Sequence, residues 1–480
     1  MEILYRSTRS DSTPITASQA ILRGFPEDGG LYVPTSVPKL EKTPAQLAQM
    51  DYRGVAYEVM RLLLTDYTEE IAPLRKSGSA WYLELFHGPT IAFKDMALSI
   101  LPHLMTTAAA KNGSGREIVI LTATSGDTGK AALAGFAGVE GTKIMVFYPK
   151  HGVSSIQERQ MVTTKGANTR VIGINGNFDD AQTSVKNLFT DKALVEEMAQ
   201  NGMQFSSANS INIGRLTPQI VYYVYAYTRL LKDGVIREGD PVNFVVPTGN
   251  FGNILAAYYA KRMGLPIGKL ICASNSNKVL FDFFTTGEYN RNREFVLTSS
   301  PSMDILISSN LERLIYHISG DDPKACAAFM KDLKEKGTYT VTEQMMQQLS
   351  DFVSGYADEE QTAREIRTVY TGDGYVIDPH TAVASSVYRR YLSETSDATP
   401  AVIDSTASPF KFEGSVMAAL GKDTSLPDLE LADKLSEVAG VPVPKAVSEL
   451  KDAPILHDIV CDRTQMKEEV RRFLGLTDKA

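Results

Sequence analysis

Short apolar runs alternate with helical patterns between residues 116 and 275, and this alternation constrains the fold more than any other feature of the sequence. The first three runs are almost continuously apolar, as strands buried on both faces of a parallel sheet are. They span 117–122, 143–148 and 169–174. Helical patterns follow them at about 130–137, 155–164 and 178–187. A strand–helix–strand repeat of this kind predicts an α/β fold with a parallel, doubly wound sheet.

A second α/β run follows the first. A long Tyr-rich helical pattern spans about 214–231, and its Tyr222, Tyr223, Tyr225 and Tyr227 are expected to lie in a core or between lobes. Strands are predicted at 242–247 and 270–274, with a turn and a helix between them. Two such runs predict two lobes, each with a mainly parallel sheet flanked by helices, and a small-ligand site in the cleft between them.

The remainder of the chain shows weaker patterns and divides into flanking regions. We expect a mixed N-terminal region, a large lobe interrupted by a helical surface insertion, a small α/β lobe and a C-terminal tail. The N-terminal region spans residues 1–86 and the C-terminal tail spans 421–480. The large lobe consists of 87–112 and 206–420, with the insertion near 321–370, and the small lobe spans 113–205.

Composition limits the class of protein. The chain has 480 residues, 43% of them hydrophobic, which suffices for a large core and two or more domains. The net charge of -8 argues against nucleic acid or an anionic membrane as the main partner. No run of roughly 18 apolar residues predicts a membrane span. The three cysteines are far apart and form no CxxC pair, so we expect no zinc site and no disulfide framework, and a cytoplasmic location. No feature predicts an oligomeric state.

One lysine occupies an unusual position. Lys94 lies in His87-Gly-Pro-Thr-Ile-Ala-Phe-Lys-Asp95, after a Gly-Pro turn and at the start of a predicted helix. An isolated lysine there is usually a surface residue, but the helix dipole disfavours a cation at this end. A partly buried lysine can lose its proton and become a nucleophile toward an aldehyde.

Two turns that join a strand to a helix could each bind an anion. Gly249-Asn-Phe-Gly-Asn253 follows one strand, and Thr124-Ser-Gly-Asp-Thr-Gly-Lys130 follows another. Backbone N–H groups at a helix N-terminus favour anions, although either turn alone could be a simple connection. The second turn is not a Walker A loop, because Ala131 stands where Ser or Thr should follow the lysine. Two anion sites and a reactive lysine together favour pyridoxal phosphate (PLP) chemistry.

The chain resembles the threonine synthases, PLP enzymes of the tryptophan synthase β-type fold (fold type II), from residue 5 to about residue 415. The similar segments are Tyr5–Arg9, Asp28–Pro34, His87–Asp95, Gly249–Asn253, Asp378–Ala382 and Ser405–Phe412.

This resemblance implies roles for individual residues. Lys94 would be the catalytic residue and would hold the cofactor as a Schiff base. The cofactor would also contact Asp127, and Thr406 would face its pyridine nitrogen. Its phosphate would be held by Gly249, Asn250, Phe251, Gly252 and Asn253. The substrate would be bound by Ser125, Gly126, Thr128, Ser210, Arg215 and Asn253. The resemblance implies no metal. Independently of it, His380 and Lys411 are expected to be structural.

The implied reaction converts O-phospho-L-homoserine and water into L-threonine and phosphate, the last step of threonine biosynthesis. Three alternatives remain open at this point. A related phospho-lyase would release 2-oxobutyrate from the same site, and a threonine or serine dehydratase would act on an unphosphorylated amino acid. A non-enzymatic relative should have lost Lys94 or a glycine of the 249–253 turn, and all are present.

Overall fold

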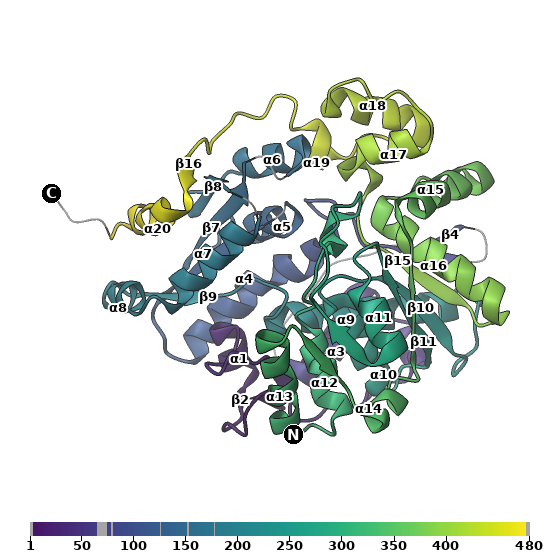
Figure 1. Cartoon of the computed structure of the whole chain (residues 1–480), viewed down its shortest axis with the longest axis horizontal. Coiled ribbons are helices and arrows are strands. Elements are labelled where there is room, and N and C mark those ends of the chain that lie inside the picture. Colours follow the sequence, from purple (N-terminus) through teal and green to yellow (C-terminus); the bar gives the residue numbers. More distant parts are fainter. Residues whose placement is uncertain are drawn as a thin grey trace.

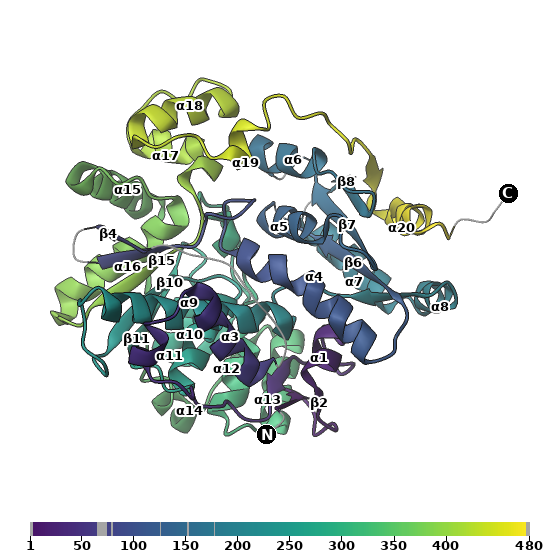
Figure 2. The ribbon, with the colours of Figure 1, turned by 180° about the vertical axis from the view of Figure 1, so that it is seen from behind.

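The computed structural model describes residues 3–64, 74–77, 80–124, 126–150, 153–176 and 178–476. Two sheets with helices on their faces lie side by side and form two lobes (Figures 1 and 2). The α/β fold expected from the alternating pattern is confirmed, with a parallel core in each sheet.

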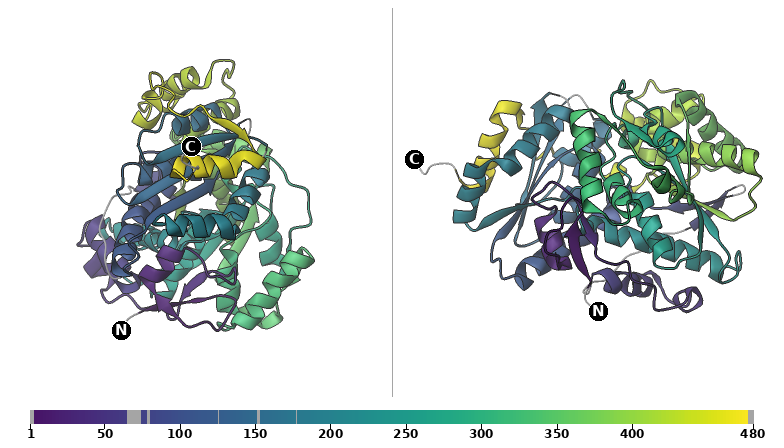
Figure 3. Two further views of the ribbon diagram at one scale, coloured as in Figure 1. Left: turned by 90° about the vertical axis from the view of Figure 1, so that its left-hand side faces the viewer. Right: turned by 60° about the horizontal axis from the view of Figure 1, so that its bottom comes forward.

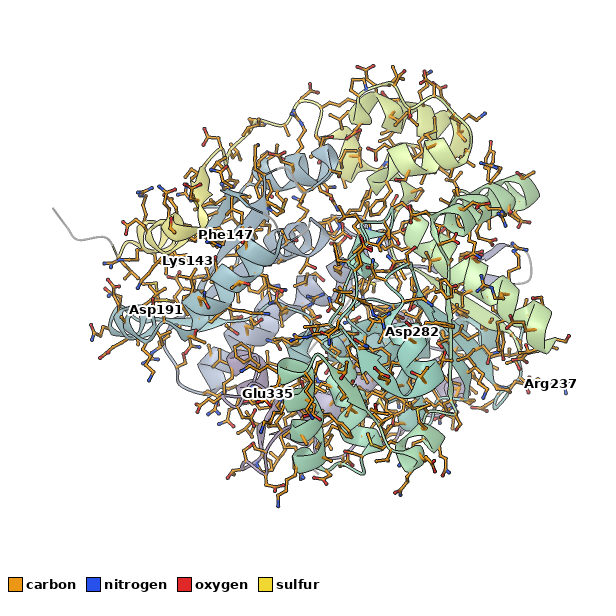
Figure 4. All side chains as sticks on the ribbon, viewed as in Figure 1. Lys143, Phe147, Asp191, Arg237, Asp282 and Glu335 are labelled. Carbon is orange, nitrogen blue, oxygen red and sulfur yellow. The ribbon has the colours of Figure 1, made fainter. Side chains whose placement is uncertain are left out.

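The small lobe contains a five-stranded sheet in the order β16-β8-β7-β6-β9, in which every pair is parallel. Its strands are β6 (Glu117–Ala123), β7 (Thr142–Pro149), β8 (Thr169–Asn175), β9 (Met203–Ser206) and β16 (Val460–Asp462). Its helices are α5 (Asp127–Phe136), α6 (Ser155–Val162), α7 (Phe178–Thr190) and α8 (Lys192–Gln200). Figure 4 labels two residues of β7: Phe147 is buried, whereas Lys143 is partly exposed and pairs with Glu117.

The large lobe contains a six-stranded sheet in the order β14-β11-β10-β15-β5-β4. Its strands are β4 (Leu74–Ser77), β5 (Ala80–Glu84), β10 (Val242–Pro247), β11 (Ile267–Ser274), β14 (Phe352–Tyr356) and β15 (Ala401–Ser405). All pairs are parallel except β4 with β5. All six residues of β10 are buried, which explains its continuous apolar run. The segment 321–370, for which the pattern predicts helices, also contributes β14 to this sheet.

Long helices bring the two lobes together. The helix α4 packs against α5 of the small lobe and against α9, and it runs between the two sheets (Figure 2). The main helices outside the small lobe are α1 (Ala17–Arg23), α3 (Tyr52–Leu63), α4 (Lys94–Lys111), α9 (Ile213–Lys232), α10 (Gly252–Arg262), α11 (Val279–Thr286), α12 (Leu311–Ile318), α13 (Pro323–Glu335), α15 (Glu359–Asp373) and α16 (Pro379–Thr395). Sixteen of the residues of α9 are buried, including Tyr222, Tyr223 and Tyr227, so these tyrosines are core residues.

The two ends of the chain pack onto this frame. Near the N-terminus, β1 (Leu4–Ser7), β2 (Ile15–Thr16) and β3 (Tyr32–Pro34) form an antiparallel sheet. The C-terminal segment carries α17 (Glu413–Ala419), α18 (Asp428–Ala439), α19 (Lys445–Ser448) and α20 (Met466–Leu474). It leaves the large lobe, packs on α6 and continues into β16 of the small sheet (Figure 3). Across the described ranges, no helix has the length and apolar character needed to cross a membrane.

Candidate active site

The amine of Lys94 lies where the two lobes meet. Lys94 is the first residue of α4, and its Nζ is 3.3 Å from Asp127 Oδ2 and 3.3 Å from Ser302 Oγ. Burial lowers the pKa of Lys94, and the positive charges of Lys411 and Arg215 act in the same direction, whereas Asp127 opposes them. The amine is therefore more readily deprotonated than a surface lysine, as a nucleophile or a proton acceptor must be.

Asp127, the first residue of α5, is the negative centre of the site. Its Oδ1 is 2.6 Å from Lys411 Nζ and accepts a hydrogen bond of 3.1 Å from Gln157 Nε2. Its Oδ2 accepts a hydrogen bond of 2.8 Å from Ser302 Oγ and contacts Lys94. Burial alone would raise the pKa of Asp127, but the charges of Lys411 and Lys94 hold it well below its usual range. One carboxylate therefore balances two buried lysines.

The turn before α5 is built around Thr124. Its Oγ1 accepts hydrogen bonds of 2.9 Å from the N–H groups of Gly126 and Gly129. Gly126 has φ of +130°, and a Cβ there would lie 2.4 Å from the Gln157 side chain, so only glycine fits. Because the N–H of Gly126 is already bonded, the turn offers an anion the N–H groups that follow it, such as that of Thr128 in the first turn of α5. Ser125, predicted to bind substrate, lies outside the described residues.

The 249–253 turn joins β10 to α10. Phe251 has φ of +63° and precedes Gly252, the first residue of α10, whose N-terminus has no side-chain cap. The carbonyl of Asn250 accepts hydrogen bonds of 3.1 and 3.0 Å from the backbone N–H and the side-chain amide of Asn310. The turn is thus held through its carbonyls. The N–H groups that begin α10, with the helix dipole behind them, suit a phosphate.

Asn253 is anchored below this turn by a buried network. Its Nδ2 donates to Asp404 Oδ2 at 2.8 Å, and its Oδ1 accepts from Tyr223 OH at 2.9 Å. Tyr223 OH also lies 2.8 Å from Asp404 Oδ2. Burial raises the pKa of Asp404 to about 7, although the contacts of its carboxyl group with Tyr223 and Asn253 oppose the rise. Because the Asn253 side chain is engaged here, its backbone N–H is the group left for the predicted phosphate contact.

Arg215 lies buried in the first turn of α9. Its Nη1 donates to the carbonyl of Ala208 at 3.0 Å, whereas its buried Nε has no hydrogen-bond partner among the described residues. Burial lowers the pKa of Arg215 to about 10. A buried guanidinium with a free donor suits an anionic ligand that completes its hydrogen bonds. Ser210, the other residue predicted to contact substrate phosphate, lies partly exposed in the turn that precedes this helix.

The segment 406–408 runs beside the residues that precede Lys94. The Thr406 carbonyl accepts a hydrogen bond of 2.9 Å from the N–H of Phe93, and Ala407 forms an antiparallel bridge with Ala92. Thr406 itself is buried. The backbone pairing therefore fixes the distance between Thr406 and Lys94, two residues far apart in sequence.

Two residues of the site were not predicted from the sequence. Ser302 and Asp404 carry no local signal, because only the tertiary fold brings them to Lys94 and Asn253. Lys411, expected to be structural, is fully buried and pairs with Asp127, which adds a second cation beside the site. Its position between two phenylalanines in Ser405–Phe412 could have indicated a buried cation that needs a carboxylate partner.

These residues fit PLP on two observations of the structure. The buried amine of lowered pKa contacts Asp127 at the start of α5, and it contacts Ser302, whose backbone packs against Gly249 in the turn before α10. The unpartnered Nε of Arg215 supplies a second anion contact near the same amine. Gly249 to Asn253 would hold the cofactor phosphate, and Lys94 its aldehyde carbon.

Comparison with known families covers nearly the whole chain. The family model described as "Threonine synthase N terminus" matches residues 4–74, "Pyridoxal-phosphate dependent enzyme" matches 72–403, and "Threonine synthase, C-terminal" matches 381–459. Human threonine synthase-like 1 is 37% identical over 488 residues, which cover 94% of this chain and 63% of that protein. This chain thus spans less than two thirds of the length of that relative.

Other relatives match over most of their length. Threonine synthase of Pseudomonas aeruginosa is 39% identical over 458 residues, covering 89% of this chain and 93% of that protein. The crystal structure of threonine synthase from yeast has 32% sequence identity and a TM-score of 0.87, and it covers 98% of this chain and 99% of that one. PLP-bound threonine synthase from Brucella melitensis has 34% identity and a TM-score of 0.79, with the same coverage. The chain therefore belongs to the threonine synthase family of pyridoxal-phosphate-dependent enzymes.

Proposed function

We propose that this protein is a threonine synthase, which converts O-phospho-L-homoserine and water into L-threonine and phosphate. One observation carries the proposal: a buried arginine with an unpartnered Nε lies close enough to Lys94 for its charge to lower the pKa of the amine. A substrate that is both an amino acid and a phosphate ester needs these two groups together. A dehydratase that acts on free threonine or serine has no need of the second anion contact.

Lys94 Nζ serves the proton transfers of this reaction. The amine is deprotonated more readily than usual, so it can take the proton from the substrate Cα and return protons to carbons within its reach. Bound pyridoxal phosphate supplies the electron sink that makes such a proton removable. Asp127 keeps a negative charge next to the amine and stabilises its protonated form after each transfer.

The substrate would be held at both ends. Gly126 shapes the turn that presents the N–H of Thr128 to the substrate carboxylate, with the dipole of α5 behind it. Arg215, with Ser210 near it in the preceding turn, would bind the γ-phosphate. Charge grows on this phosphate as its bond to carbon breaks, so a fixed guanidinium stabilises the departing group more than the bound substrate.

The cofactor contacts follow from the same frame. Gly249, Asn250, Phe251, Gly252 and Asn253 would bind the cofactor phosphate with the N–H groups at the start of α10. Thr406 would place a hydroxyl at the pyridine nitrogen, and Asp127 would lie near the reactive end of the ring. The three cysteines are buried and free of disulfides, which supports our proposal of a cytoplasmic location.

Product identification tests the proposal. The purified protein, supplied with pyridoxal phosphate and O-phospho-L-homoserine, should release phosphate and L-threonine in equal amounts. The Lys94→Ala variant is the control for the site. A phospho-lyase would instead release 2-oxobutyrate and ammonia with the phosphate, and this product in place of threonine would reject the proposal.

A further inference from the structure

We propose that Ser302 and His380 are positioning residues that hold the amine of Lys94 at the place where it meets the cofactor. The inference deepens the proposed function and rests on it. Neither residue has a role in the reaction described above. Together they link the amine to a buried carboxylate, Asp378, which anchors the whole arrangement to the start of α16.

Ser302 is the contact that touches the amine. It lies in the short 3-10 turn Pro301–Met303, and its Oγ is 3.3 Å from Lys94 Nζ. The same oxygen donates a hydrogen bond of 2.8 Å to Asp127 Oδ2, so its proton is committed and its lone pairs face Lys94. The amine therefore has two fixed acceptors, one from each lobe.

His380 holds the backbone of that turn. The N–H of Ser302 donates to His380 Nε2 at 3.2 Å, which requires a lone pair on Nε2. The ring proton then resides on Nδ1, which donates to Asp378 Oδ2 at 2.7 Å. His380 is 3% exposed and Asp378 is fully buried, so solvent does not compete for either bond.

Asp378 is held firmly enough to serve as an anchor. It is the N-cap of α16, where its carboxylate accepts hydrogen bonds from the N–H groups of His380 and Thr381 and from the Thr381 hydroxyl. The hydrogen bonds from Asp378 through His380 to Ser302 thus begin at the buried N-terminal end of α16 in the large lobe. A side chain supported in this way loses little freedom when it aligns a reacting group.

The turn of Ser302 also touches the predicted phosphate site. A Cβ built on Gly249 would lie 2.6 Å from the Ser302 carbonyl oxygen, so the two backbones are packed together. One turn therefore contacts both the amine that meets the cofactor aldehyde and the loop that would hold the cofactor phosphate.

The test measures how fast pyridoxal phosphate attaches to Lys94, independently of turnover. The full chain, stripped of cofactor, is mixed with pyridoxal phosphate, reduced with borohydride at successive times and analysed by peptide mass. Ser302→Ala and His380→Leu should slow attachment about 10-fold or more, because misplacement by about 1 Å can cost two orders of magnitude. His380→Gln, which keeps an acceptor near the Nε2 position, should remain within about 3-fold of wild type.

A variant that carries both Ser302→Ala and His380→Leu tests whether His380 acts through Ser302. If His380 acts through Ser302, adding His380→Leu to Ser302→Ala should slow attachment by less than about 3-fold more, whereas independent effects would multiply. Ser299→Ala, two positions before the turn, is the matched control and should leave the rate unchanged. Melting temperatures distinguish a positioning effect from a general loss of structure. A general loss of structure would lower both the melting temperature and the attachment rate in both His380 variants.

The outcomes are distinct from those for the reaction itself. An unchanged attachment rate in Ser302→Ala, or multiplying effects in the double variant, would overturn this inference while the proposed function stands. A wild-type protein that attaches the cofactor at Lys94, slows as expected in the variants and makes no threonine would refute the proposed function alone. A wild-type protein that attaches no cofactor at Lys94 would refute both.

Discussion

Lys411 Nζ lies 2.6 Å from Asp127 Oδ1, and this fully buried lysine approaches the carboxylate through the oxygen that Lys94 leaves free. Asp127 is therefore shared by two buried cations. Removing its charge by Asp127→Asn should lower the free energy of unfolding by about 3 kcal/mol at pH 7, because two lysines would then be buried without a counter-charge. Urea unfolding measures this difference.

A surface pair provides the control for that experiment. Asp332 forms an exposed ion pair with Lys336 on the outside of the large lobe. Asp332→Asn should change the free energy of unfolding by less than about 1 kcal/mol. Equal losses in the two variants would contradict the central role given to Asp127.

Replacing Lys94 should remove the reactive group without removing the fold. We expect Lys94→Ala to abolish both borohydride-trapped pyridoxal phosphate and turnover, because the variant loses the buried amine whose pKa is lowered. Lys192 is the matched control, since it is also the first residue of a helix but is exposed. Trapped cofactor on a different lysine of the wild-type protein would disprove the assignment.

Arg215 should contribute mainly to the rate of phosphate departure. Arg215→Ala is expected to lower kcat by a factor of about 100 to 1,000, the usual cost of losing a group that stabilises developing charge. Arg215→Lys should recover only part of this loss, because an ammonium does not offer the planar fork of a guanidinium. Phosphate release from O-phospho-L-homoserine measures both. Arg229→Ala, on the exposed side of the same helix, is the control, and equal kinetics for Arg215→Ala and Arg229→Ala would remove Arg215 from the site.

The buried carboxyl of Asp404 should make stability depend on pH. Its pKa of about 7 in the folded protein exceeds its usual 3.8, so the folded state binds the proton more tightly than the unfolded state. The free energy of unfolding should therefore fall as pH rises from about 4 to about 7, by at most about 4 kcal/mol from this group. Asp404→Asn should flatten this fall in urea unfolding series at pH 4.5 to 7.5. Parallel curves for the variant and the wild type would show that Asp404 is ionised throughout.

Strands that follow one another along the chain and also pair in the sheet could be predicted from the sequence. The runs at 117–122, 143–148 and 169–174 became β6, β7 and β8, because burial on both faces leaves a continuous apolar pattern. Lys94 was found because a cation at a helix start is conspicuous. The roles of the site residues remain predictions, but the fold does place Asp127 and Arg215 where their charges act on the amine of Lys94.

Residues and strands whose contacts lie far away along the chain show no local pattern from which they could be predicted. Ser302 is an ordinary serine in a polar loop, and only its contact with Lys94, 208 positions away along the chain, gives it importance. The strand β16 has only three residues, too few for a period to be recognised, and it pairs with β8, which is even farther away along the chain. Local patterns carry information about neighbours and cannot encode such contacts.

The pairing of β16 with β8 has a consequence for how the protein is made. Asn175 in β8 hydrogen-bonds to Asp462 in β16, 287 positions later in the chain. A ribosome must therefore synthesise nearly all of the chain before β16 can pair with the free edge of β8. Until then β8 presents unpaired backbone to other nascent chains, which is a site of edge-to-edge aggregation. Shortening the protein before residue 460 should therefore impair its yield in the supernatant before it impairs its chemistry.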